Sequence, residues 1–208
     1  DYHLRGIANG WDATPFVTYY QMGDDVWQND TVWPPSGTTM WDFQLIENSG
    51  ALLLEPSPTV FGLDSVNVQF DPTDPSPTWG GPTLRADQVQ GPYDIVDTIE
   101  SRGDVLIFNH YCDQDIVLQG APVVHLKVSA DVYDTDFAVR LCDVTPTGES
   151  YILLDDIQRM RYRNGFENSD TAAIVPGQVY DIELQLPDIA YTFLTGHTIR
   201  LDISGSNY

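Results

Sequence analysis

The chain has 208 residues, of which 42% are hydrophobic and 12% aromatic, a composition typical of a globular protein that buries a sizeable core. Its 31 Asp and Glu outnumber nine Lys and Arg, and the formal net charge of −22 would repel phosphate backbones and anionic lipid surfaces. We therefore expect neither nucleic acid nor a membrane as a partner, and no apolar run reaches the roughly 18 residues of a membrane span. No segment identifies a cellular compartment.

The first ten residues, DYHLRGIANG, predict at most a short helical turn, and short apolar segments with period-two alternation follow along the chain. The clearest predicted strands are 15–22, 65–70, 104–109, 122–130, 137–144, 151–156, 179–186 and 198–204. Turn clusters such as ENSG, PTGES, VPGQ and LTGH separate several of them, and PDIAYTFL at 187–194 predicts a second short helical turn. Eight or more strands would leave an apolar face wet in one open sheet, so the sequence predicts an all-β sandwich of two sheets.

One stretch, DPTDPSPTWGGPTL from Asp71 to Leu84, contains four prolines and two glycines. Because proline fixes its own φ and pushes the preceding residue toward extended conformations, this stretch should be stiff. Stiffness alone does not distinguish a spacer from a shaped loop.

No catalytic set is evident in the sequence. The G-x-S-x-G motif of α/β-hydrolases is absent, and neither His125 nor His197 has a nucleophile and a carboxylate nearby in sequence, so both are expected to be structural. His110 lies close to Cys112, which suggests a thiol nucleophile, but a base must reach the thiol in the folded state and sequence adjacency does not establish this.

The sequence predicts no cofactor and assigns no metal ligand. Asp134 and Asp136 lie on one face of a strand, where they suit either calcium or arginine partners, with Arg140, Arg161 and Arg163 as the candidates. An EF-hand loop starting at Asp71 fails at its sixth and twelfth positions.

Two further residue types leave alternatives open. Cys112 and Cys142 permit one disulfide and fit no metal or redox spacing, and Cys142 lies in an apolar strand where a buried thiol is ordinary. Aromatic residues near turns, Trp11, Trp27, Trp33 and Trp79, could stack on sugars or belong to the core or an interface.

Seven segments in order carry a family resemblance. They are YYQMGDDVWQNDTVWPP (19–35), DPTDPSPTWGG (71–81), ESRGDVLIF (100–108), DTDFAVRLCDV (134–144), RMRYRNGFE (159–167), PGQVYDIELQL (176–186) and GHTIRLDISGSNY (196–208). Together they resemble the C-terminal non-catalytic β domain of the X-Pro dipeptidyl-peptidase and cocaine esterase (CocE/NonD) serine hydrolases, which include α-amino acid ester hydrolases. The resemblance covers nearly the whole chain.

The resemblance implies a jelly-roll with a galactose-binding-like topology at 13–208, preceded at 1–12 by the remnant of the connection from an α/β-hydrolase catalytic domain. It also implies that the catalytic triad lies in that domain, so His3 is not the catalytic histidine and the chain alone should hydrolyse nothing. The expected function is that of an accessory domain that packs on the catalytic domain of a dipeptidyl-peptidase or of an acyl ester or amide hydrolase. The alternative is a free-standing carbohydrate-binding jelly-roll.

The resemblance also assigns a role to the proline-rich loop. Thr83 and Leu84 correspond to residues that help wall the substrate pocket, and Trp79, Gly80, Gly81 and Pro82 shape the approach; alternatively, these residues only cap the sandwich. A Leu84→Ala change is expected to alter substrate preference behind a matching catalytic domain. Because further strands follow 196–208 in the family, the resemblance implies an open sheet edge there, which predicts association into a homo-oligomer.

Overall fold

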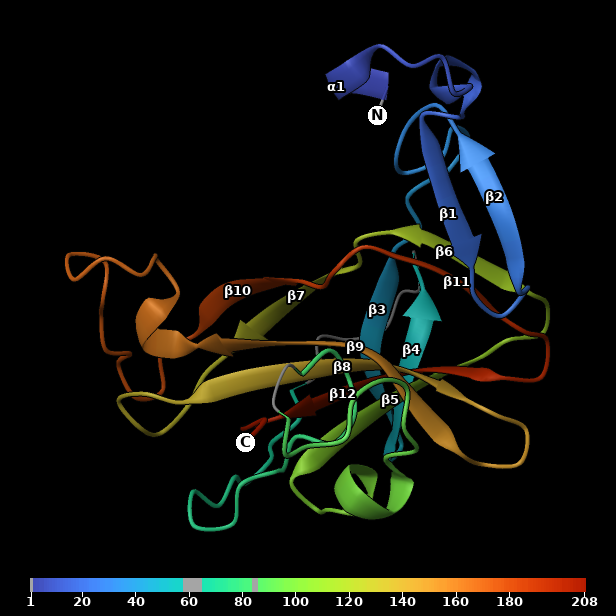
Figure 1. Cartoon of the computed structure of the whole chain (residues 1–208). Helices are drawn as coiled ribbons and strands as arrows, with labels where there is room; N and C mark the ends of the chain where they lie inside the picture. Colours follow the sequence, from blue (N-terminus) through green and yellow to red (C-terminus); the bar gives the residue numbers. More distant parts are fainter. Residues whose placement is uncertain (1, 58–64, 84–85) are drawn as a thin grey trace.

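The computed structural model describes residues 2–57, 65–83 and 86–208, and strands dominate it (Figure 1). The strands are β1 Val17–Gln21, β2 Val26–Asp30, β3 Phe43–Asn48, β4 Ala51–Pro56, β5 Val105–Tyr111, β6 Ile116–Gly120, β7 Val123–Val128, β8 Asp136–Val144, β9 Ser150–Arg159, β10 Tyr180–Gln185, β11 Ile189–Phe193 and β12 Thr198–Ser204. The helical segments are short: α1 Tyr2–Arg5, η1 Trp11–Ala13, η2 Val96–Glu100 and η3 Met160–Tyr162. Among the described residues, none of these segments has the length and hydropathy that crossing a bilayer requires.

The larger sheet has six strands in the order β3-β4-β5-β12-β8-β9, antiparallel except between β4 and β5. The strand β12 lies in its interior, where Leu201 faces Phe108 of β5 on one side and Leu141 of β8 on the other. The expectation of an open edge along residues 198–204 is therefore wrong, because both sides of this strand are already paired. Homo-oligomerisation stays a prediction, but an open edge at this strand no longer supports it.

The opposite layer is a bent ribbon in which β6 pairs with β11 and β7 pairs with β10, both antiparallel. The β1–β2 hairpin joins this ribbon through two backbone bonds, from the Met22 amide to the Ala190 carbonyl and from the Thr192 amide to the Met22 carbonyl. The hairpin and the residues before it project away from the two layers (Figure 1). The chain is thus an all-β sandwich, as the strand pattern predicted.

Two local predictions are wrong. Residues 187–194 were expected to form a helical turn, but Ile189–Phe193 is the strand β11, because its backbone groups pair with β6. Residues 65–70 were expected to form a strand, but they adopt no regular structure, and Phe70 packs edge-on against Phe137, with ring centroids 6.4 Å apart.

The main core lies between the two layers. Alternate residues of β8 and β12 point into it, including Val139, Leu141 and Leu201, and Leu126 and Leu184 meet them from β7 and β10. Each fully buried aliphatic side chain of this kind contributes about 1.5–3 kcal/mol relative to an exposed one.

The outer face of the six-stranded sheet is also covered. Ile95 and Ile99 of the segment around η2 pack there against Val105, Cys142 and Ile152. The segment between β4 and β5 that carries these residues includes the proline-rich stretch, and the strands on either side of it belong to one sheet. Residues 71–83 are therefore part of a loop within the sandwich.

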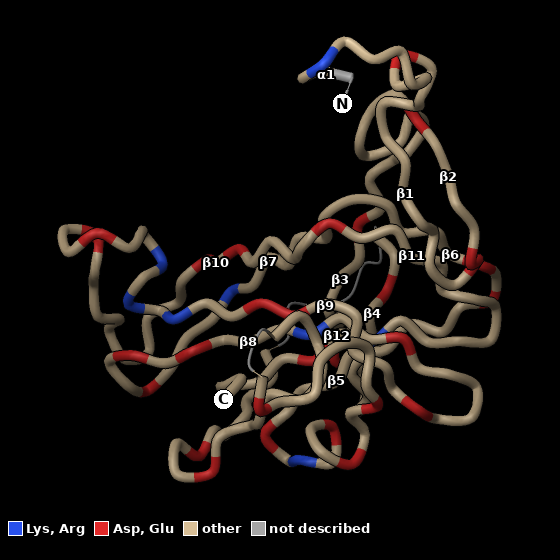
Figure 2. Tube along the Cα trace, viewed as in Figure 1, with Lys and Arg blue, Asp and Glu red and all other residues tan. Residues whose placement is uncertain are grey.

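Acidic side chains are spread over strands and loops instead of gathering in one patch (Figure 2). Basic residues are few, and several lie in the part of the molecule where β7 and β9 end and β10 begins. The negative charge is a property of the whole surface, which agrees with the scattered carboxylates in the sequence.

Candidate functional site

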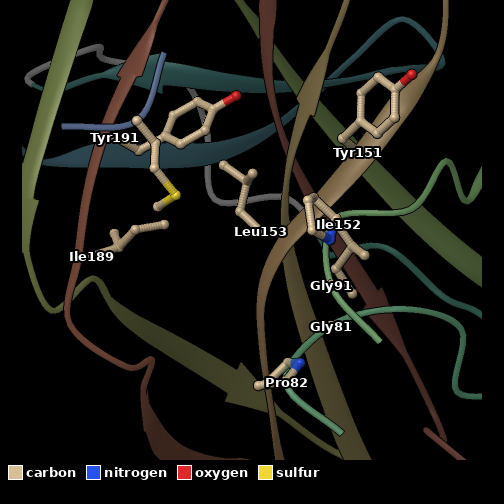
Figure 3. Close-up of a pocket in the computed structure, with 10 residues that line it drawn as sticks. Gly81, Pro82, Gly91, Tyr151, Ile152, Leu153, Ile189 and Tyr191 are labelled. Atoms are coloured by element: carbon tan, nitrogen blue, oxygen red, sulfur yellow. The ribbon is translucent and has the colours of Figure 1, made fainter. Parts of the chain in front are cut away.

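A cavity of about 480 Å³ lies where the loop before η2 meets β9, β11 and the turn after β1. None of the described side chains that line it is charged, and Figure 3 shows that they come from segments far apart in sequence. The lining residues are Met22, Gly81, Pro82, Gly91, Pro92, Tyr151, Ile152, Leu153, Ile189 and Tyr191. Such a concave, mainly apolar surface suits an apolar group of a ligand or of another domain.

The predicted loop residues reach this cavity in part. Gly81 and Pro82 line it, Gly80 is buried directly beside it, and Trp79 is 38% exposed and does not line it. Thr83 is half-buried and is not among the lining residues. Leu84 lies outside the described residues.

A left-handed backbone explains the two glycines, and close packing adds a second reason at Gly80. Gly80 and Gly81 both have φ of +72°, a left-handed conformation that residues with a Cβ rarely adopt. A Cβ placed on Gly80 would lie 2.8 Å from the carbonyl oxygen of Gly91 and 2.9 Å from Cγ2 of Ile152. The loop can therefore approach β9 closely at Gly80 because this position carries no side chain, whereas a Cβ on Gly81 would make ordinary contacts, 3.5 Å from Asp155 and Ile152.

A buried polar network fixes the opposite wall. The side-chain amide of Gln21 donates to Oγ1 of Thr192 at 3.0 Å, and the Thr192 hydroxyl donates to Oδ2 of Asp24 at 2.9 Å. Gln119 of β6 donates to Oε1 of Gln21 at 2.9 Å. These bonds anchor the base of the β1–β2 hairpin on β11 and so hold Met22 at the cavity.

Tyr191 connects the cavity to a histidine–carboxylate pair. Its hydroxyl donates to Oδ2 of Asp143 at 2.7 Å, and Nδ1 of His197 lies 2.9 Å from Oδ1 of the same carboxylate. Burial and the Asp143 carboxylate raise the pKa of Tyr191, so the phenol stays protonated and keeps donating. Sequence reasoning did not find this carboxylate for His197, because 54 residues separate the two.

A second buried polar cluster lies on the outer face of the larger sheet. Glu100 accepts a hydrogen bond from Ser150 at 2.5 Å and forms an ion pair with Arg200. Neither carboxylate oxygen of Asp202 has a hydrogen-bond partner, and burial followed by the Glu100 charge raises the pKa of Asp202 to about 8. Glu100, Cys142 and Asp202 are one set of side chains that lie close enough to share a metal ion.

The arrangement around that set favours a neutral polar core over a cation site. Arg200 already neutralises Glu100, and the pKa of Asp202 leaves it protonated at neutral pH. Burial raises the pKa of the Cys142 thiol well above its usual value, which disfavours the thiolate that binds metals.

The Asp134 and Asp136 carboxylates are bound by arginines. Arg161 donates to Asp134, and Nε of Arg159 lies 2.9 Å from Asp136. Of the three predicted arginines only Arg161 is correct; Arg140 is buried elsewhere, and Arg163 donates to the carbonyl oxygens of Met160 and Ala172. The spacing of the two aspartates was consistent with arginine partners, but it did not indicate which arginines would bind them.

The remaining histidines and cysteines take structural positions. The His110 ring packs edge-on against Phe43, with centroids 5.1 Å apart, and His125 pairs with Glu183 on the exposed side of β7 and β10. Cys112 and Cys142 are free and buried, and burial raises the pKa of the Cys112 thiol. A thiolate nucleophile at Cys112 is therefore disfavoured.

Most of the cavity was not predicted from sequence. Tyr151, Ile152 and Leu153 were expected in a strand, but nothing marked them as a wall, and Ile189 and Tyr191 were assigned to a helical turn. The pair Gly91–Pro92 repeats the Gly–Pro dipeptide of 81–82, which is the one local signal that could have pointed to it.

Comparison with known proteins identifies the fold and the family. The sequence model of one protein family, the X-Pro dipeptidyl-peptidase C-terminal non-catalytic domain, matches residues 9–208. Cocaine esterase from Rhodococcus sp. (strain MB1 Bresler) is 34% identical over 215 residues, which cover 100% of this chain and 37% of the esterase. The chain thus spans about a third of the length of that relative.

Solved structures agree. An α-amino acid ester hydrolase superposes with a TM-score of 0.79 at 28% identity, over 94% of this chain and 34% of the hydrolase. An aminopeptidase from a marine sediment Thaumarchaeota archaeon superposes with a TM-score of 0.73 at 28% identity, over 93% of this chain and 33% of the aminopeptidase. The chain therefore belongs to the X-Pro dipeptidyl-peptidase C-terminal non-catalytic domain family.

Proposed function

We propose that this chain is the accessory domain of an α/β-hydrolase-type serine hydrolase and that its apolar cavity faces the catalytic domain, where it helps wall the pocket for the substrate. The observation that carries the proposal is the cavity itself, which combines Gly81 and Pro82 of the predicted loop with apolar side chains from β9 and β11. The substrate of the whole enzyme would be an ester, an amide or an X-Pro peptide. The names of the relatives describe ester or peptide hydrolysis.

Exposed apolar side chains on and just before the β1–β2 hairpin, whose strand β1 is followed directly by the cavity residue Met22, support a missing partner. Trp27 is 67% exposed and stacks edge-on against Tyr20, which is 39% exposed, on the hairpin that projects from the sandwich. Phe16, just before this hairpin, is 88% exposed. Large side chains concentrated on one projecting element are typical of a surface that another domain covers. Under this proposal, residues 1–12 connect to that catalytic domain.

A hybrid enzyme tests the proposal. This chain replaces the C-terminal domain of the Rhodococcus cocaine esterase, and hydrolysis is measured with esters of small and large acyl groups. The hybrid should be active and the chain alone inactive. Leu153→Ala enlarges the cavity and should change the ratio of kcat/KM between large and small esters several-fold, whereas Val179→Ala, at an exposed position that does not line the cavity, should leave it unchanged. An active hybrid with the same ratio in both variants would contradict a role in the substrate pocket.

If the hybrid is inactive, binding between the separate chain and the catalytic domain tests the proposal instead. The chain is titrated calorimetrically into the separate catalytic domain of the same esterase. Trp27→Ser should weaken binding by about tenfold or more, as expected for a buried aromatic at an interface. Tyr133→Ser is the control, since Tyr133 is 73% exposed in the loop between β7 and β8, at the other end of the molecule (Figure 1). Equal weakening by both variants, or saturable binding of simple glycans in place of the catalytic domain, would count against the proposal.

A further inference from the structure

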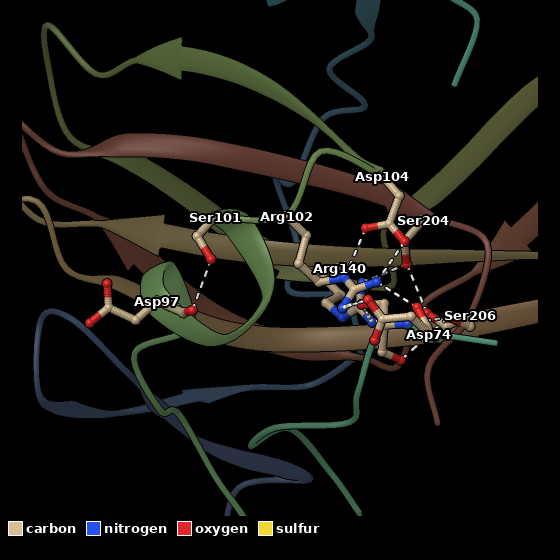
Figure 4. Close-up of polar contacts among 9 residues, drawn as sticks. Asp74, Asp97, Ser101, Arg102, Asp104, Arg140, Ser204 and Ser206 are labelled. Carbon is tan, nitrogen blue, oxygen red and sulfur yellow. Dashed lines mark hydrogen bonds and ion pairs between the residues drawn. The ribbon is translucent and has the colours of Figure 1, made fainter. Parts of the chain in front are cut away.

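Arg140 is a fully buried arginine whose bonds go to neutral groups. It lies in β8, opposite Asp202 of β12, and no ion pair within 4.0 Å joins these two side chains. Its guanidinium donates instead to Oγ of Ser204 at 2.9 Å and to the carbonyl oxygen of Ser206 at 3.2 Å (Figure 4). Burying a charge of this kind costs free energy, and Nε of Arg140 has no hydrogen-bond partner among the described residues, so the buried charge depends on the bonds that the two terminal nitrogens make.

The same guanidinium connects two segments that are far apart in sequence. It donates to Oδ1 of Asn207 at 3.2 Å and contacts Oγ of Ser76 at 3.5 Å. Ser76 belongs to the proline-rich loop and Asn207 to the segment after β12, so Arg140 lies beneath the place where the two meet.

Backbone bonds complete this junction. The Thr78 amide donates to the Tyr208 carbonyl at 2.7 Å, and the Tyr208 amide donates to the Ser76 carbonyl at 3.0 Å. The Thr78 hydroxyl also donates to Oδ1 of Asn207 at 3.0 Å. The loop is therefore held to the last residues of the chain as in a short piece of sheet.

The contacts continue from the junction to the cavity wall. The side-chain amide of Asn207 donates to Oδ2 of Asp155 at 2.7 Å. Both carboxylate oxygens of Asp155 lie 3.5 Å from the position that a Cβ of Gly81 would occupy. Gly81 is bonded to Gly91 through both backbone amides, and both glycines line the cavity. Hydrogen bonds thus lead from Arg140 through Asn207 to Asp155, and residues 76–78, which pair with 206–208, lie just before the Gly80–Pro82 wall along the chain.

We propose that Arg140 is a positioning residue, which sets the place of the Gly80–Pro82 wall through Asn207, Asp155 and the paired segments 76–78 and 206–208. Its importance for catalysis rests on the proposed function, whereas the positioning itself is a property of this chain. A stiff proline-rich loop transmits such a constraint better than a flexible one, because fixing one end at Ser76 restricts the residues that follow.

Amide hydrogen exchange on the 208-residue chain tests the proposal and does not depend on any catalytic domain. Arg140→Met should speed exchange at Thr78, Tyr208, Gly81 and Gly91 by about ten- to a hundredfold. Amides between β7 and β10, such as that of Leu126, should change far less. Arg140→Lys keeps the charge with a simpler donor and should give an intermediate effect at the four junction and wall amides.

Two results would overturn the proposal. One is faster exchange by the same factor at all of these amides, which would indicate a loss of global stability only. The other is faster exchange at Thr78 and Tyr208 without any change at Gly81 and Gly91, which would separate the junction from the wall. If Arg140→Met does not fold, Asn207→Ala removes the bonds to Arg140 and Asp155 at a half-buried position and keeps the buried arginine, so it should reproduce the pattern.

Discussion

Gly81 and Gly91 are hydrogen-bonded to each other in both directions, with N–O distances of 2.8 and 2.9 Å. This isolated pair of backbone bonds joins the proline-rich stretch to Gly91, and both glycines line one wall of the cavity. The shape of the wall therefore depends on backbone groups that side chains must not displace.

Substitution of the neighbouring glycine should show this dependence. Gly80→Ala combines a positive φ with a Cβ 2.8 Å from the Gly91 carbonyl oxygen, so we expect a loss of about 2–4 kcal/mol in the free energy of unfolding. The control is Gly37→Ala, where φ is +95° and no atom lies within 4 Å of the added Cβ, with an expected loss of about 1–2 kcal/mol. Urea unfolding measures both, and equal losses would show that the wall tolerates the added methyl group.

The protonation of Asp202 should appear in the pH dependence of stability. Its pKa is about 8 in the folded chain against an ordinary value near 3.8, so its contribution is complete below about pH 4 and is lost as the pH rises through 8. The slope is at most about 1.4 kcal/mol per pH unit. Asp202→Asn, which removes the titration, should flatten the fall in unfolding free energy between pH 5 and 8.

The control for this measurement is Asp97→Asn, at an exposed position on η2. It removes one negative charge without touching the buried cluster. A pH profile that flattens equally in both variants would mean that general charge repulsion, and not Asp202, causes the fall.

The net charge of −22 predicts a strong dependence of stability on salt. Repulsion among surface carboxylates is screened as the Debye length falls from about 20 Å to about 6 Å between 0.02 and 0.3 M NaCl. We expect the Tm to rise by several degrees over this range, as followed by circular dichroism. Sucrose of matched osmolality is the control, and an equal rise in sucrose would exclude screening as the cause.

The Asp134–Arg161 contact should be a modest stabilising pair and not a calcium site. A double-mutant cycle with Asp134→Ala and Arg161→Ala should give a coupling energy of about 0.2–1 kcal/mol, as for other partly exposed ion pairs. Addition of millimolar calcium should leave the Tm unchanged. A rise in Tm with calcium that Asp134→Ala abolishes would favour the cation site.

Sequence patterns predicted the structure correctly in most places where neighbouring residues along the chain determine it. Alternation along Phe137–Val144 and Thr198–Ser204 predicted strands, and the structure buries most of their side chains on both faces of the sheet. Proline and glycine spacing predicted a stiff loop at 71–84, and ordered motifs predicted the family. Even so, period two failed at residues 65–70, which form no strand in the structure.

The sequence by itself thus determined the all-β class and the family, since alternation and motif order are both read along the chain. Only the tertiary structure decided that β12 lies inside the sheet, that Ile189–Phe193 is a strand, and that the Asp143 carboxylate lies within hydrogen-bond distance of His197. It also brought Arg140 beneath the junction of Ser76 with Asn207. The physical reason is that strand pairing, burial and buried hydrogen bonds join residues 50 to 170 positions apart, and no local pattern specifies which partners will meet.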